Sequence, residues 1–255
     1  MFFKKWRRRA LLAQPFPQAW QRILDQKVPY YQVLPEADKQ ELRGHITVFL
    51  DEKHFEGAGG LTLTEEMKVV VAAQACVLLL HRKTDYYPTL SSIILYPSSY
   101  QAPHTVVLPG GVVAEDPQAR LGESWGMGAV VLAWDNVLQS ARNIHDGRNL
   151  VFHEFAHQLD EEDGTANGRP VLRLKTQYAE WAKVLSGEFE VLGELAAEHK
   201  KTLIDPYGAA NPAEFFAVIT ETFFEKPIQL RDKHPQLYTQ LKLFYQQDPA
   251  QLFQN

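Results

Sequence analysis

The sequence has very little cysteine: Cys76 is the only one among its 255 residues. A single thiol cannot form an internal disulfide, so nothing here indicates an oxidising compartment. Nor can it supply a cysteine-based zinc cluster. Any metal ion would therefore have to be bound by histidine, aspartate or glutamate.

The chain also lacks an excess of positive charge, with 26 Lys and Arg against 31 Asp and Glu and a net charge of -5. This balance argues against nucleic-acid binding as the main activity. The longest apolar stretch, Val69 to Leu80, has 12 residues and contains Gln74, whereas a membrane span needs about 20. Glycine-rich phosphate loops of either common type are absent, which disfavours nucleotide chemistry. We therefore expect a soluble, cytoplasmic protein without a transmembrane segment.

Basic residues are concentrated in the first nine positions, MFFKKWRRR, which hold five of the 26. The apolar run that follows, residues 10–13, is too short for a signal peptide. We predict that residues 1–19 form a flexible, solvated terminus. The alternative is weak contact with an acidic membrane surface or partner. Without repeats, low-complexity tracts or a clear linker, residues 20–255 are expected to form one domain.

Within that domain, residues up to about 88 are expected to be helical, residues 89–160 to hold a sheet and a helix, and residues 161–255 to be helical again. The strands are expected at 92–96, 105–108 and 129–134, where β-branched residues are bounded by proline and glycine. The flanking residues are Pro97, Pro109, Gly110, Gly111, Gly126 and Gly128. The helices are expected at 35–54, 65–81 (with Thr64 as N-cap), 149–160, 176–199, 211–224 and 235–247. This order indicates an α+β fold without βαβ alternation.

A metal-binding pattern lies in the helix expected at 149–160. His153-Glu154-Phe155-Ala156-His157 is an H-E-x-x-H motif. Side chains four residues apart lie on one face of a helix, so both imidazoles can bind one zinc ion. Zinc lowers the pKa of a bound water toward about 7, and the neighbouring Glu154 can accept its proton as a general base. The alternative to a metal site is that the two histidines are buried core residues with hydrogen-bond partners, beside a glutamate that forms an ion pair.

The third zinc ligand must come from elsewhere, because catalytic zinc sites usually have three protein ligands and one open position. A metzincin-type histidine would fall near residue 163, but residues 160–168 read DEEDGTANG, which excludes that class. The helix expected at 211–224 offers Glu214 and Glu221, which share a face. Glu214 also fits a capping box with Asn211 as N-cap. Spacing alone does not choose between the two glutamates.

These residues resemble the Mlc titration factor A family of bacterial zinc-dependent peptidases. The matching patterns are H-E-x-A-H-x-L-D (153–160), D-x-Y-x-A-x-x-P-A-E-x-F-A-V (205–218), F-Y-Q-Q-D-P (244–249) and the strand residues 130–134. The resemblance covers roughly residues 20 to 253. It implies a zincin-like core of the gluzincin type, similar to that of anthrax lethal factor, with N-terminal helices, a small central sheet and C-terminal helices.

The same resemblance implies roles for further residues. It makes Glu214 the third zinc ligand, because Glu214 occupies the glutamate of the P-A-E-x-F-A pattern, and it leaves Glu221 as a residue that supports the ligands. It also favours Tyr207 as a phenol that stabilises the oxyanion, although a tyrosine merely packed near the site is the alternative. Asp160 could orient a ligand imidazole or cap the end of its helix.

Two functions are compatible with this sequence. The first is a zinc-dependent peptidase, aminopeptidase or endopeptidase, whose peptide substrate lies along strand 129–134 as an edge strand. Gly126 and Gly128 would allow the substrate backbone to approach the start of that strand closely, or they serve only as turn residues. The second is a regulatory protein that captures a glucose-responsive repressor of the Mlc type, the property from which the family takes its name. We expect a monomer in either case.

Overall fold

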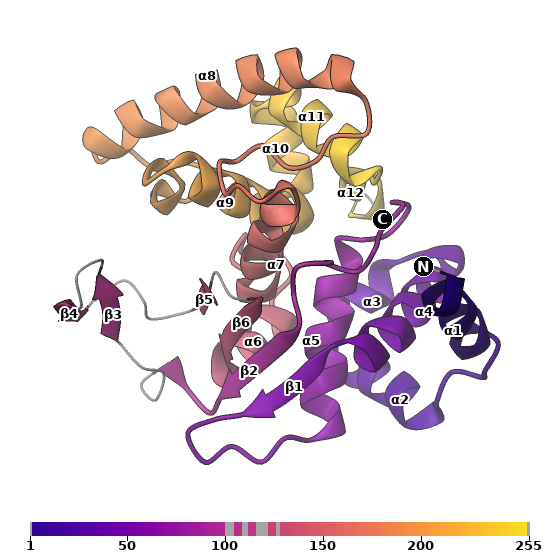
Figure 1. The fold of residues 1–255 in the computed structure, drawn as a ribbon. Coiled ribbons are helices and arrows are strands. Elements are labelled where there is room, and N and C mark those ends of the chain that lie inside the picture. Colours follow the sequence, from indigo (N-terminus) through magenta and orange to yellow (C-terminus); the bar gives the residue numbers. More distant parts are fainter. Residues whose placement is uncertain (1, 100–104, 109–111, 116–121, 126–127, 254–255) are drawn as a thin grey trace.

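The computed structural model describes residues 2–99, 105–108, 112–115, 122–125 and 128–253. Figure 1 shows a small sheet and the helix α7 at the centre, with N-terminal helices on one side and C-terminal helices on the other. The expected α+β order of helices, strands and helices is confirmed. Pro109, Gly110, Gly111 and Gly126, which were expected to bound strands, lie outside the described residues.

The N-terminal helices are α1 (Phe2–Leu12), α2 (Gln18–Lys27), α3 (Pro29–Val33), α4 (Glu36–Glu52) and α5 (Glu65–Val77). Thr64 caps α5 as predicted, because its side chain accepts a hydrogen bond from the Met67 N–H. The helix ends at Val77 rather than at residue 81. Residues 2–12, predicted to be a flexible terminus, are helical, and arginines of α1 form ion pairs with acidic residues of α4.

Among the described residues, the central sheet has four strands in the order β1 (His54–Gly57), β2 (Ser92–Tyr96), β6 (Ala129–Ala133) and β5 (Gly122–Trp125). The first three are parallel and β5 is antiparallel. The sequence indicated no βαβ alternation, and it gave no sign of the single βαβ unit that β1, α5 and β2 form. Strand β1 has the sequence HFEG, which contains no β-branched residue, and it begins at the last residue of the helix predicted at 35–54. Strands β3 (Thr105–Leu108) and β4 (Val112–Glu115) form a separate antiparallel pair.

The prediction of an edge strand at 129–134 is also wrong. Strand β6 lies between β2 and β5, so both of its edges are already paired. The edges of this sheet are β1 and β5. Gly128 is a turn residue, since its φ is 78° and its carbonyl accepts the N–H groups of Ser91 and Ser92.

After the sheet the chain returns to helices, α6 (Trp134–Arg142), α7 (Leu150–Asp160), α8 (Tyr178–Ala197), α9 (Pro212–Glu225), α10 (Pro227–Lys233), α11 (Pro235–Tyr245) and α12 (Pro249–Leu252). Helix α6 was not predicted, and it begins at Trp134, the last residue of the predicted strand. Helix α7 packs against α5, α9 and the strands β5 and β6, and its apolar residues from Val151 to Leu159 are buried. The described helices include none long and apolar enough to cross a membrane.

Candidate metal centre

Helix α7 presents the two histidines of the motif on one face. Asn149 begins the helix, and its side-chain oxygen accepts the Phe152 N–H at 3.0 Å. Phe152 and Phe155 are completely buried on the other faces, which fixes the rotation of the helix about its axis. The side chains of His153 and His157 remain 14% and 12% exposed, and they point toward α9.

Helix α9 brings the third side chain. Asn211 caps this helix alone, because its Oδ1 accepts the Glu214 N–H at 3.0 Å. Instead of turning back to Asn211, the carboxylate of Glu214 lies against the histidines. Its Oε2 is 3.0 Å from Nε2 of His153 and 3.5 Å from Nε2 of His157.

The three donor atoms form a triangle that fits a metal ion. Its third side, between Nε2 of His153 and Nε2 of His157, measures 3.2 Å, and the three residues can each offer one ligand atom to a shared ion. For a tetrahedral zinc ion with ligands at about 2.0–2.1 Å, donor atoms lie about 3.3 Å apart. The sides of the triangle are close to that value, so His153, His157 and Glu214 could hold zinc.

Charges in this triangle are strongly coupled. Burial alone would lower the pKa of His153, but hydrogen bonds with Glu214 and Glu221 raise it well above its ordinary value. Burial would raise the pKa of Glu214, yet hydrogen bonds from both histidines hold it well below its usual range. The Glu214 carboxylate therefore stays ionised, and it strongly favours a positive charge beside it, which a protonated His153 supplies here. The same electrostatics would favour a metal ion.

Glu154 has a different environment from Glu214. It is only 3% exposed, and burial raises its pKa while the charges of His153 and His157 act in the opposite direction. A raised pKa makes a carboxylate a better proton acceptor, provided that it remains ionised at the working pH. This is the property that a general base requires.

Glu221, one of the two alternatives for the third ligand, lies behind His153. Its Oε1 accepts a hydrogen bond from Nδ1 of His153 at 2.7 Å, and its Oε2 accepts the Asn149 N–H at 2.6 Å. A hydrogen bond at Nδ1 fixes the imidazole so that Nε2 faces the triangle. Glu221 therefore contacts the nitrogen of His153 that faces away from the triangle, and its supporting role stays a prediction.

Sequence reasoning missed two residues, Gln74 of α5 and Glu225 of α9, that fasten the start of α7 to these helices. The Nδ2 group of Asn149 donates to Oε1 of Gln74 and to Oε1 of Glu225, each at 3.0 Å. Glu225 Oε2 also accepts the Gly147 and Arg148 N–H groups. Burial and the neighbouring Asp146 outweigh these bonds and raise the pKa of Glu225 to about 9. The four-residue spacing from Glu221 to Glu225 is the sequence signal that could have suggested a shared helix face.

Asp160 is buried at the end of α7. Its Oδ2 accepts the Gly168 N–H at 2.7 Å, which ties the following loop to the helix. Gly168 has a φ of 73°, and a Cβ atom there would lie 2.3 Å from the carbonyl oxygen of Pro212. Its own carbonyl accepts the indole N–H of Trp181. These contacts tie the loop after α7 to the helices around it, and both alternatives for Asp160 stay predictions.

Tyr207 lies beside the triangle of donor atoms on the short 3₁₀ helix η4 (Pro206–Ala209), which Asp205 caps through the Tyr207 N–H. Its ring centroid is 6.0 Å from that of His153. The residue is 44% exposed, so a molecule bound at the triangle could reach it. The position is compatible with both the catalytic and the packing alternatives.

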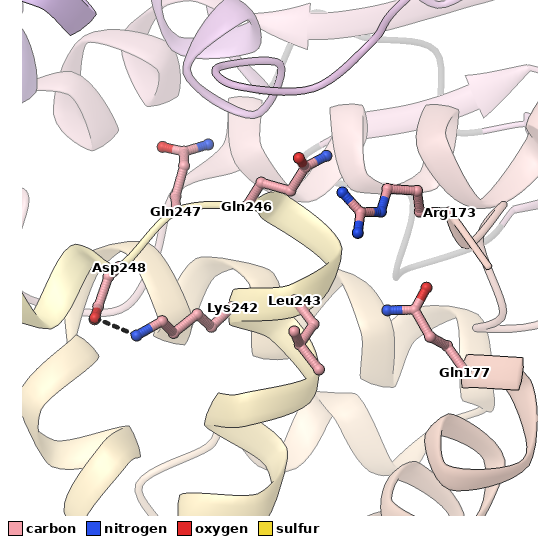
Figure 2. A pocket seen from close by; sticks show the side chains of 7 residues that line it. All are labelled: Arg173, Gln177, Lys242, Leu243, Gln246, Gln247 and Asp248. Carbon is pink, nitrogen blue, oxygen red and sulfur yellow. Dashed lines mark hydrogen bonds and ion pairs between the residues drawn. The ribbon is translucent and has the colours of Figure 1, made fainter.

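A separate pocket of about 270 Å³ lies near the C-terminal end of α11 and includes no residue of the triangle. Figure 2 shows its lining side chains and the ion pair between Lys242 and Asp248, which measures 2.6 Å. The lining residues are Arg173, Gln177, Lys242, Leu243, Gln246, Gln247 and Asp248. This pocket has no part in the metal centre.

Comparison with known proteins agrees with the geometry. The family of glucose-regulated metallo-peptidases M90 matches residues 3–246. An uncharacterized protein of Synechocystis, slr2042, is 42% identical over 245 residues, which are 96% of this chain and 89% of that protein. Mlc titration factor A of Serratia proteamaculans is 32% identical over 238 residues (90% and 87%). Its counterpart in Escherichia coli O7:K1 is 31% identical over 240 residues (91% and 87%). The resemblance predicted from the motifs is confirmed, and the chain belongs to the M90 metallopeptidase family.

Proposed function

We propose that this protein is a zinc-dependent peptidase in which His153, His157 and Glu214 hold the metal. The observation that supports this most directly is the triangle of donor atoms, whose sides of 3.0, 3.2 and 3.5 Å suit a tetrahedral ion. Bound zinc would supply Lewis-acid chemistry, which polarises the scissile carbonyl and acidifies water.

The chain's own residues supply the remaining steps. Glu154 takes a proton from the attacking water and returns it to the leaving amine. Tyr207 stabilises the negative charge that develops on the carbonyl oxygen. Glu221 keeps His153 in the orientation that binds the metal. The buried position of Glu154 and its raised pKa support its assignment as the base.

The substrate is proposed to lie along β5 rather than β6. Strand β5 is an edge of the sheet and packs beside α7, the helix that carries both histidines. Figure 1 shows it on the α7 side of the sheet. An extended peptide can add to such an edge through main-chain hydrogen bonds.

The test compares the wild type with Glu154→Gln for zinc content and for hydrolysis of a peptide panel. The panel includes peptides with free and with blocked amino termini, so it also separates aminopeptidase from endopeptidase activity. We expect about one zinc in each protein and hydrolysis by the wild type alone. Loss of zinc from the variant would contradict the assignment of Glu154 as the base, and zinc binding without hydrolysis by the wild type would contradict the peptidase.

The names of the relatives favour a second, compatible function. Proteins called Mlc titration factor A match over about 90% of this chain, and we propose that it also binds a repressor of the Mlc type in the cytoplasm. If that binding uses a surface apart from the catalytic base, Glu154→Gln should bind the purified repressor as tightly as the wild type in a pull-down titration. Loss of binding would tie capture to catalysis.

A further inference from the structure

Helix α1 is attached to the body of the protein by its cations. Lys4 lies 3.1 Å from Asp85, Arg7 lies 2.8 Å from Asp51, and Arg8 lies 2.7 Å from both Glu52 and Asp85. The Arg8 guanidinium also lies over the Tyr86 ring, 4.5 Å from its centroid. The face that meets α4 is therefore largely polar.

Two aromatic side chains of α1, those of Phe3 and Trp6, point the other way. Phe3 is 75% exposed and Trp6 is 67% exposed, more than any other large apolar residue that the structure describes. Three residues apart on the helix, their rings lie side by side with centroids 6.1 Å apart. A helix that only needed to pack on α4 would bury these rings and expose its cations, so the arrangement is reversed.

Two further cations flank the exposed rings. Lys5 and Arg9 are one helical turn apart and exposed, and within the described part of the chain neither has an ion-pair partner. The first acidic residue of the sequence is Asp25, so no carboxylate of this segment opposes them. The outward face of α1 thus combines two exposed aromatic rings with uncompensated positive charge.

We propose that the outward face of α1, formed by Phe3, Lys5, Trp6 and Arg9, docks on an anionic lipid bilayer. Helices of this kind lie in the plane of the membrane interface, with aromatic rings among the headgroups and cations on acidic lipids. A second copy of the chain is less suitable because its Lys5 and Arg9 would repel these residues. Nucleic acid is less suitable because the chain is acidic overall.

The experiment is vesicle sedimentation of the full chain carrying its purification tag at the C-terminus. One vesicle set is phosphatidylcholine alone and the other is equal parts of phosphatidylcholine and phosphatidylglycerol. We expect binding to the second set that weakens as salt rises. The variants Phe3→Ser/Trp6→Ser and Lys5→Glu/Arg9→Glu should each lose about tenfold or more in partitioning. The matched control Leu174→Ser/Leu243→Ser removes two exposed apolar side chains elsewhere and should bind as the wild type does.

A second measurement follows Trp6 directly. Brominated lipid in the acidic vesicles should quench the fluorescence of the wild type and leave Trp6→Phe much less quenched. Failure of the wild type to bind, equal binding to both vesicle sets, or equal loss in the control would each overturn the proposal. The proposal would also be overturned if the wild type does not bind vesicles but forms a dimer in analytical ultracentrifugation, and the Phe3→Ser/Trp6→Ser variant is a monomer.

Discussion

At the scale of single residues, Glu214 could either close a capping box with Asn211 or face the two histidines, and in the structure it faces the histidines. Its place in the first turn of α9 would allow it to close a capping box. Asn211 already caps the helix through its own side chain, however, and the carboxylate of Glu214 lies 3.0 Å from His153. Glu221, seven residues later, accepts a hydrogen bond from Nδ1, the other nitrogen of the His153 ring.

This difference predicts the outcome of two matched substitutions. Glu214→Ala removes a donor atom from the triangle and should abolish stoichiometric zinc binding. Glu221→Ala removes only the bond that orients His153 and should weaken zinc affinity by about 10–100-fold. Competition against a chromogenic zinc chelator measures both affinities. If Glu221→Ala lost more affinity than Glu214→Ala, the assignment of the third ligand would be reversed.

At the scale of elements, α7 and α9 make the site because both are fixed by buried polar contacts as well as by apolar packing. Asn149 is the central residue of these contacts. It caps α7, donates to Gln74 of α5 and Glu225 of α9, and offers its N–H to Glu221. The start of α7 is thereby tied to two other helices.

Asn149→Ala should therefore lower the free energy of unfolding by more than the loss of a helix cap alone would. A cap alone contributes about 1 kcal/mol, and leaving buried partners unpaired adds about 1–3 kcal/mol. We expect a total of about 2–4 kcal/mol in the free energy of unfolding, measured by urea denaturation. Asn211→Ala is the matched control, since it makes the same change at the cap of α9 and should cost about 1 kcal/mol. Equal costs would show that the contacts to α5 and α9 add nothing.

Apolar residues at helical spacing predicted the long helices, and runs of β-branched residues bounded by proline and glycine predicted the strands at 92–96, 105–108 and 129–134. The H-E-x-x-H spacing located the histidines. Strand β1 was not predicted because its sequence, HFEG, contains no β-branched residue, and the antiparallel β5, which pairs with β6, was not anticipated. The ties from Gln74 and Glu225 to Asn149 join residues about 75 positions apart, and no local pattern reports contacts at that separation.

At the scale of the whole molecule, the proposed ion would join two helices that are separated by more than 50 residues of chain. A ligand that binds only the folded state stabilises it by about 3–4 kcal/mol when present at 100–1,000 times its dissociation constant. Removal of zinc with a chelator should lower the melting temperature by roughly 10 °C. Differential scanning calorimetry with and without chelator measures the change.

Glu214→Ala provides the control for this stabilisation, because a protein that cannot hold the ion should melt at the same temperature in both conditions. An equal fall in the variant and the wild type would mean that the chelator acts elsewhere on the protein.

Gly168 shows how the position of the metal centre depends on a residue without any chemistry. It touches the end of α7 through Asp160, α8 through Trp181 and the first turn of α9 through Pro212. Any side chain there would push against Pro212, two residues before Glu214. Among sequences that diverge from this one, a lost glycine at this position should therefore accompany a lost or relocated third ligand, even where the H-E-x-x-H motif is intact.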